Sequence, residues 1–89
     1  MIDKILEDRA KTHGNFSVQA HIAQTLKEVT VPFKHKLTAS QRESVDMILH
    51  KIARICAGDP NEIDHWQDIA GYATLVAKQL GEGGKNERD

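Results

Sequence analysis

At 89 residues the chain has room for one domain, and its balance of 39% hydrophobic and 28% charged residues is that of a globular fold. Its net charge of −1 argues against a dedicated nucleic-acid-binding protein, because such proteins carry a basic excess. A single cysteine excludes an intrachain disulfide framework, and no apolar run approaches the roughly 20 residues needed to span a bilayer. We therefore expect a cytoplasmic protein with no secretory signal, no membrane association and no direct contact with nucleic acid.

Two helices are predicted in the first third of the chain. The first covers residues 2–12 and is stopped by Gly14, because glycine readily adopts the left-handed conformation that follows a helix C-terminus. The second runs from Phe16 or Ser17 to Val29, where apolar side chains recur every three or four residues. That spacing gives the second helix one apolar stripe.

Residues 30–38 are predicted to be a connection. Pro32 lacks a backbone N–H and restricts the residue before it, so the second helix cannot easily continue. Phe33 and Leu37 are expected to pack onto the helical bundle.

The third helix is predicted to begin near Ser40. Ser40 and Glu43 match a capping box, in which each side chain bonds the backbone N–H of the other residue, and Thr38 is an alternative cap. Gly58 ends this helix. Its apolar face consists of Val45, Ile48, Leu49, Ile52, Ile55 and Cys56.

The fourth helix is predicted to begin at the Asp59-Pro60 pair, with Asp59 as the N-cap, and to stop at Gly81. Because the link after Gly58 is short, the third and fourth helices should form a tight antiparallel hairpin. The residues on the apolar face of the fourth helix are Ile63, Trp66, Ile69, Ala70, Ala73 and Ala77.

Together these elements predict an all-α fold, a small antiparallel bundle of three to four helices within residues 1–81. Residues 82–89 are polar and contain glycine, and we expect a disordered tail there. A core this small would gain stability from a partner chain, so the protein is expected to be oligomeric.

Acidic residues on the last two helices are candidates for a shared ligand. Asp64 and Asp68 lie one turn apart on the fourth helix, and Glu43 and Asp46 lie on one ridge of the third. Like charges at the spacing of Asp64 and Asp68 repel by roughly 0.2–0.5 kcal/mol on an isolated helix. A hard cation such as Mg²⁺ would relieve this repulsion and keep waters for bound phosphates.

Basic residues of the third helix complete this hypothesis. Arg54 and His50 share the acidic ridge, and Arg54 and Lys51 could neutralise phosphate oxygens. The alternative is a solvated surface, because Asp64 falls in a first helical turn where acids complement the macrodipole. Asp68 would then simply pair with Arg42, Lys51 or Arg54.

The order of three segments carries a family resemblance. They are LEDRAKTHGNFS (6–17), DMILHKIARICAGDP (46–60) and DHWQDIAGYATL (64–75). The chain resembles a family of small phage and prophage proteins that share an R-x-x-x-H-G-[DN]-F element, a K-I-A-R-I helix and a D-x-W-x-D-I-A-G-Y-A helix. That family is itself similar to the all-α nucleoside triphosphate pyrophosphohydrolases of the MazG type.

The resemblance implies that a (deoxy)nucleoside triphosphate is split into monophosphate and pyrophosphate with Mg²⁺ or Mn²⁺, by a homodimer or homotetramer in the cytoplasm, or in the host cytoplasm if a phage encodes it. The metal-ligand positions are met here by Glu43, Asp46, Asp64 and Asp68. The catalytic candidates that would orient or deprotonate water are Glu43, Asp46 and His50. The substrate-binding candidates are Lys51, Arg54, Arg9, Lys11, His13, Asn15 and Tyr72.

The chain departs from the family pattern at its acids. The usual paired glutamates are missing, and Asp64 and Asp68 are spaced by four residues rather than three. Two alternatives therefore stay open: an inactive module that binds nucleotide or protein, and a structural helical oligomer without a ligand. A DNA-binding helix-turn-helix is disfavoured, because the acids of the fourth helix would meet phosphate with the wrong sign.

Overall fold

The computed structural model describes residues 2–84, and within this range the chain is helical with no strand. Its elements are α1 (Ile2–His13), α2 (Phe16–Thr30), the 3₁₀-helix η1 (Val31–Lys36), α3 (Ala39–Ala57) and α4 (Ile63–Gly84). The prediction of an all-α fold is confirmed. The connection expected over residues 30–38 contains η1, whose first turn accommodates Pro32.

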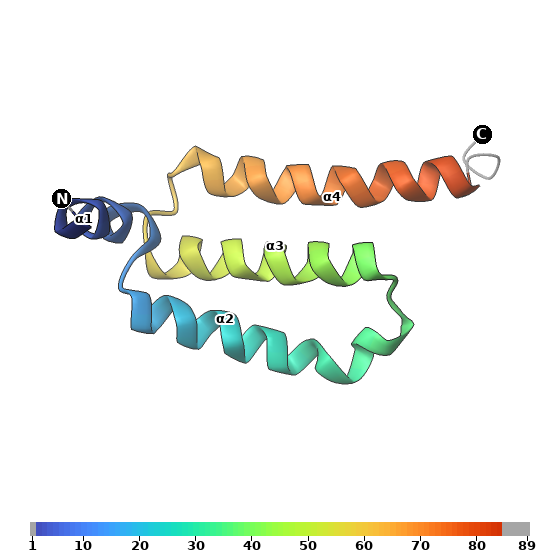
Figure 1. Cartoon of the computed structure of the whole chain (residues 1–89), viewed down its shortest axis with the longest axis horizontal. Helices are drawn as coiled ribbons and strands as arrows, with labels where there is room; N and C mark the ends of the chain where they lie inside the picture. The colour runs from blue at the N-terminus through green and yellow to red at the C-terminus, as the bar shows by residue number, and fades with distance from the viewer. Residues whose placement is uncertain (1, 85–89) are drawn as a thin grey trace.

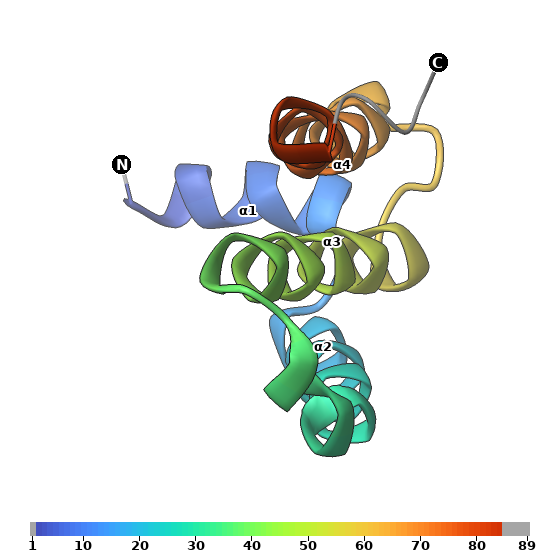
Figure 2. The same ribbon diagram turned by 90° about the vertical axis from the view of Figure 1, so that its right-hand side faces the viewer.

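The helix α3 is the centre of the fold. The helices α2 and α4 lie on opposite sides of α3, so the three form a single layer (Figure 1). The shorter α1 runs across this layer and packs beside α3 near the C-terminal end of that helix (Figure 2). A layer one helix thick leaves much of each helix uncovered. The radius of gyration is 15.6 Å, whereas a compact domain of this length would have about 12 Å.

Capping side chains explain where the helices begin. Asn15 caps α2 by accepting a hydrogen bond from the backbone N–H of Val18 at 3.2 Å. Thr38 caps α3 in a reciprocal capping box with Gln41, so the expected box starting at Ser40 is wrong and the alternative cap is confirmed. The reason is that α3 already begins at Ala39, which places Ser40 inside its first turn.

The ends of α4 differ from the prediction. The side chain of Asp59 accepts a hydrogen bond from the backbone N–H of Asn61, which makes a turn, and the helix begins only at Ile63. At the other end α4 continues to Gly84, so the expected stop at Gly81 is wrong. A glycine within a helix costs only about 1 kcal/mol relative to Ala, so it does not by itself end the helix. Residues 85–89 of the expected tail lie outside the described residues.

The core of the single chain is small. Within the described residues its buried apolar side chains are only Ala23 and Ala53, and no large side chain is fully buried. Phe33, expected on the bundle, is 61% exposed, and Cys56, expected on the core face, is also exposed. Cys56 is exposed because the single layer leaves part of the surface of α3 uncovered. Phe33 is exposed because η1 projects beyond that layer. None of the described helices has the length and hydrophobicity needed to cross a membrane.

Candidate functional site

A close backbone contact joins the C-terminal end of α1 to that of α3. Gly14 has φ +83°, and a Cβ at this position would meet the carbonyl oxygen of Ala57 and lie 2.8 Å from the nitrogen of Gly58. A Cβ at Gly58 would in turn lie 2.6 Å from the nitrogen of Gly14. The backbone N–H of Asp59 donates to the carbonyl of Thr12 at 3.0 Å. The two glycines therefore do more than end their helices. Because neither has a side chain, the backbone after α1 can pass directly against the backbone after α3.

The helix α4 is tied to the same corner by a histidine. His65 is buried, and its Nε2 lies 3.1 Å from the carbonyl oxygen of Thr12, which fits donation from the ring N–H. The ring of His65 also faces that of His13, with 5.3 Å between the centroids. His13 of α1 and His65 of α4 thus lie against each other at the C-terminal end of α3.

A polar cleft of about 310 Å³ opens between these three helices. Inside it, Lys51 of α3 is buried and forms an ion pair with Asp68 of α4, with 3.0 Å between Nζ and Oδ2. Burial of a charged amine is tolerable here because the carboxylate compensates it. The lining residues are Thr12 and His13 of α1, Lys51 and Arg54 of α3, and Glu62, Asp64, His65 and Asp68 beside and within α4.

Arg54 is the least satisfied cation of the cleft. Its Nε atom is buried and has no hydrogen-bond partner. Burial and the nearby charge of Arg9 lower the pKa of Arg54, whereas Asp68 acts in the opposite direction. Because a guanidinium stays charged in any case, this buried N–H is left without compensation in the single chain, while Arg54 itself lines the cleft.

The surrounding positive charge also acts on His13. Burial, followed by the charges of Arg54, His65, Lys51 and Arg9, lowers the pKa of His13 to about 4. The imidazole is therefore neutral at pH 7. Burial is the larger cause of this pKa shift, and the neighbouring cations act in the same direction.

A second cleft of about 450 Å³ lies on the other side of His13 and Arg54, which line both clefts. Its walls mix the cation of Arg9 with apolar groups such as Phe16. His50 of α3 also lines this cleft, and burial, then the charges of Arg54, Lys27 and Lys51, lowers its pKa. The remaining lining residues are Leu6, Ala10, Gly14 and Gln19.

The structure therefore brings together many of the residues selected from the sequence. Those that line one or both of the two adjoining clefts are Arg9, His13, His50, Lys51, Arg54, Asp64 and Asp68. Asp68 makes the ion pair with Lys51 that the solvated-surface alternative anticipated.

Other selected residues lie elsewhere. Asp46 pairs with Lys34 of η1, with 2.7 Å between Nζ and Oδ1. Lys11 lies 3.9 Å from Asp8 on the exposed side of α1. Asn15 is occupied as the cap of α2.

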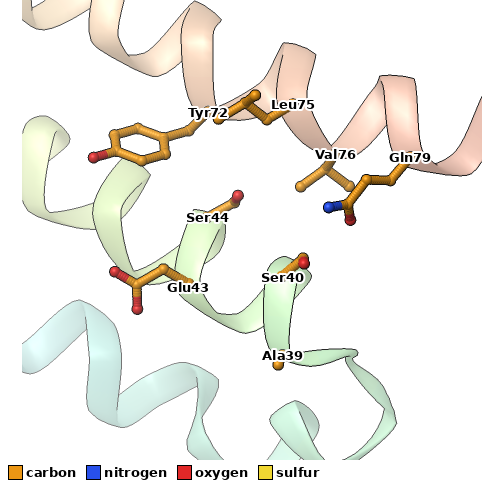
Figure 3. Close-up of a pocket in the computed structure, with 8 residues that line it drawn as sticks. All are labelled: Ala39, Ser40, Glu43, Ser44, Tyr72, Leu75, Val76 and Gln79. Carbon is orange, nitrogen blue, oxygen red and sulfur yellow. The ribbon is translucent and has the colours of Figure 1, made fainter.

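Glu43 and Tyr72 line a third pocket of about 380 Å³ between α3 and α4. In Figure 3, Ser44 points from α3 toward α4, whereas the carboxylate of Glu43 points away from α4. Glu43 also lies eight residues before Lys51 on α3, a distance of about 12 Å along the helix. Of the four predicted metal ligands, Asp64 and Asp68 thus share one cleft, whereas Glu43 and Asp46 lie elsewhere.

No group of three or more His, Cys, Asp or Glu side chains in residues 2–84 is arranged to hold a metal ion. Sequence reasoning also missed His65, which is the buried link between α1 and α4. The burial of His65 could have been predicted from its spacing. His65 precedes Ile69, Tyr72 and Val76 at helical intervals, so it lies on the side of α4 that packs on α3.

A family model described as a domain of unknown function, DUF6378, matches residues 2–80. The chain belongs to the DUF6378 family. No curated protein and no solved structure matched the chain. Both clefts lie entirely within the matched residues, so they are part of the DUF6378 domain itself.

Proposed function

We propose that this DUF6378 chain is a nucleotide pyrophosphohydrolase of the phage and MazG-like kind, which splits a (deoxy)nucleoside triphosphate into a monophosphate and pyrophosphate. The observation that carries the proposal is the cleft in which Lys51 and Arg54 face Asp64 and Asp68 across the end of α1. Phosphate-binding cations beside a pair of carboxylates are what such a reaction requires.

Binding of the triphosphate would use the basic side of the cleft. The guanidinium of Arg54, which lines the cleft, would donate to a phosphate oxygen, and charge-assisted bonds of this kind are among the strongest in proteins. Lys51 would share its charge between Asp68 and the phosphates. Arg9 stands in the adjoining cleft, where the less polar wall near Phe16 suits a base or sugar.

The carboxylates of the cleft suit a divalent cation. Mg²⁺ is commonly held by one or two carboxylates together with waters and substrate phosphates, a set that Asp64 and Asp68 can supply. When bound there, Mg²⁺ or Mn²⁺ would screen the triphosphate charge and lower the pKa of a water. Glu43 and Asp46 would join this set only if a second chain brought them to the cleft.

Proton transfer is assigned to a histidine of the second cleft. The pKa of His50 is lowered by burial and by neighbouring cations, so its imidazole is neutral at pH 7 and able to accept a proton. His50 lies beside Arg54, which would hold the phosphates. His50 lines only the second cleft, so it would take the proton of a water that attacks from that side of Arg54.

We also propose that the active form is a homodimer or homotetramer in which α3 and α4 keep the hairpin arrangement. Ten or more large apolar side chains are at least half exposed in the described chain, among them Ile5, Phe16 and Trp66. Apolar surface on this scale favours burial against another chain.

The alternative proposal is a domain of the same fold that binds nucleotide or protein without turnover. It is favoured by the ion pair of Asp46 with Lys34 and by the position of Glu43 outside the cleft. These contacts leave the cleft with fewer acids than the resemblance implies.

The test uses the purified full chain with Mg²⁺ or Mn²⁺ and a panel of ribo- and deoxyribonucleoside triphosphates, with pyrophosphate release as the readout. Arg54→Gln should abolish release and nucleotide-induced thermal stabilisation. The matched control is Arg42→Gln, an exposed arginine of the same helix outside both clefts. Stabilisation by nucleotide without pyrophosphate release would support the alternative, and neither effect with any nucleotide would reject both the enzyme and a nucleotide-binding domain.

A further inference from the structure

The outer part of α4 carries an apolar stripe with the spacing of a coiled-coil seam. Its members alternate three and four residues apart along the helix, and all are exposed: Ile63, Trp66, Ala70, Ala73, Ala77 and Leu80. This is the pattern of the a and d positions that one helix presents to another. The Nε1 atom of Trp66 donates to the carbonyl of Pro60 at 2.8 Å, so the indole presents only apolar surface.

The stripe is separate from the surface of α4 that packs on α3. Between Ile63 and Leu80, the buried or half-buried residues of the helix are His65, Ile69, Tyr72 and Val76. At 100° per residue, the stripe is centred roughly 90° around the helix from these residues. The polar cleft with Asp64 and Asp68 lies on the other side, so a partner helix on the stripe would leave the cleft open.

We propose that this stripe binds α4 of a second copy of the chain, in an antiparallel pair. The sizes of its residues are complementary when the helix is turned end for end. With the twofold axis between Gly71 and Tyr72, Trp66 faces Ala77 of the other copy. In the same register Ile63 faces Leu80, and Ala70 faces Ala73. A parallel pair would instead place Trp66 against Trp66 and leave the alanines apart, which combines overpacking with voids.

Charge supports a copy of the same stripe as the occupant. The charged Asp, Glu and Lys residues of the described α4 are Asp64, Asp68, Lys78 and Glu82, and all lie outside the positions that flank the seam. The flanking positions hold uncharged residues such as Gln67 and Thr74. Two such helices meet without like-charge repulsion, whereas a charged partner would lose solvation without gaining an ion pair.

The exposed area is sufficient for such an interface. The chain exposes 6565 Å², whereas a compact monomer of 9.9 kDa would expose about 5,200 Å². The surplus of roughly 1,400 Å² belongs to the chain as a whole, and a homodimer interface on α4 would draw on part of it. The lack of any fully buried large side chain in the described residues supports the same conclusion.

The first test measures the mass of the full chain by sedimentation velocity over a concentration series. Ala73→Glu should weaken association about tenfold or more, because it buries an unpaired carboxylate at the centre of the seam. The matched control is Leu75→Glu, an exposed apolar residue of the same helix on another face, which should associate like the wild type. A monomeric wild-type chain, or equal effects of the two variants, would overturn the proposal.

The second test reports the direction of the pair and does not depend on a destabilised variant. A nitroxide is placed at Glu82→Cys in a Cys56→Ser background, and the distance between labels is measured by pulsed electron resonance. An antiparallel pair places the two positions roughly 30 Å apart along the axis, whereas a parallel pair places them level with each other, separated only by the interaxial spacing of about 10 Å and the outward reach of the two side chains. A short distance, or no dipolar coupling, would contradict the antiparallel pair. Neither result depends on nucleotide hydrolysis.

Discussion

The contact between Gly14 and Gly58 gives the sharpest prediction about stability. In Gly14→Ala the new Cβ would meet the backbone carbonyl of Ala57, and Gly14 has φ +83°. The left-handed conformation costs an L-residue roughly 1–2 kcal/mol. Because the obstacle is backbone, α1 must also move away from α3, which removes the hydrogen bond between Asp59 and Thr12. That bond contributes about 0.5–1.5 kcal/mol. We therefore expect Gly14→Ala to lower the free energy of unfolding by about 1.5–3.5 kcal/mol.

The measurement is urea denaturation followed by the fluorescence of the single tryptophan, at one fixed chain concentration. The control is Gly71→Ala in α4, where a Cβ would meet nothing within 4 Å. It should stabilise the chain by up to about 1 kcal/mol, because alanine is the better helix former. A loss below about 0.5 kcal/mol in Gly14→Ala, or equal changes in the two variants, would refute the close contact between α1 and α3.

Two further predictions concern the charged groups of the cleft. Asp68→Asn should lower the free energy of unfolding by about 1–2 kcal/mol, because it leaves the buried Lys51 without its counter-ion while Asp68 itself is 48% exposed. Asp64→Asn has no ion pair to lose in the described chain, so the same denaturation assay should show less than about 0.5 kcal/mol, and equal losses would contradict the assignment. His13 should titrate near pH 4 by NMR, and since its folded pKa lies below the value of 6.5 for a free histidine, stability should fall as pH drops from 6.5 towards 4. Arg54→Gln should raise the pKa of His13, and an unchanged midpoint in that variant would show that the two groups do not interact.

Local sequence signals were sufficient for the helices themselves. Apolar spacing and the stop at Gly14 reflect interactions within a few residues, which the sequence displays directly. The start of α3 required a choice between Thr38 and Ser40, and both were visible as capping residues. The extension of α4 past Gly81 was missed because one glycine costs little inside a long helix.

The candidate site was only partly predictable. Lys51 and Arg54 lie one turn apart on one helix, as Asp64 and Asp68 do, so their pairing needed only the link after Gly58. Glu43 was assigned to the same site because it shares a ridge with Arg54. A ridge fixes direction around a helix but not position along it, and Glu43 lies about 12 Å from Lys51 along α3.

The sequence alone determined that the chain is helical, where most helices begin and which residues carry the charge. Tertiary structure decided that α1 crosses α3 at Gly14 and Gly58, and so placed His13, Arg54 and His65 at one corner. It also decided that α3 is covered by single helices on opposite sides, which left Trp66 and much of α4 exposed. The physical reason is that helix formation depends on neighbours along the chain, whereas crossing and covering depend on contacts between residues far apart in it.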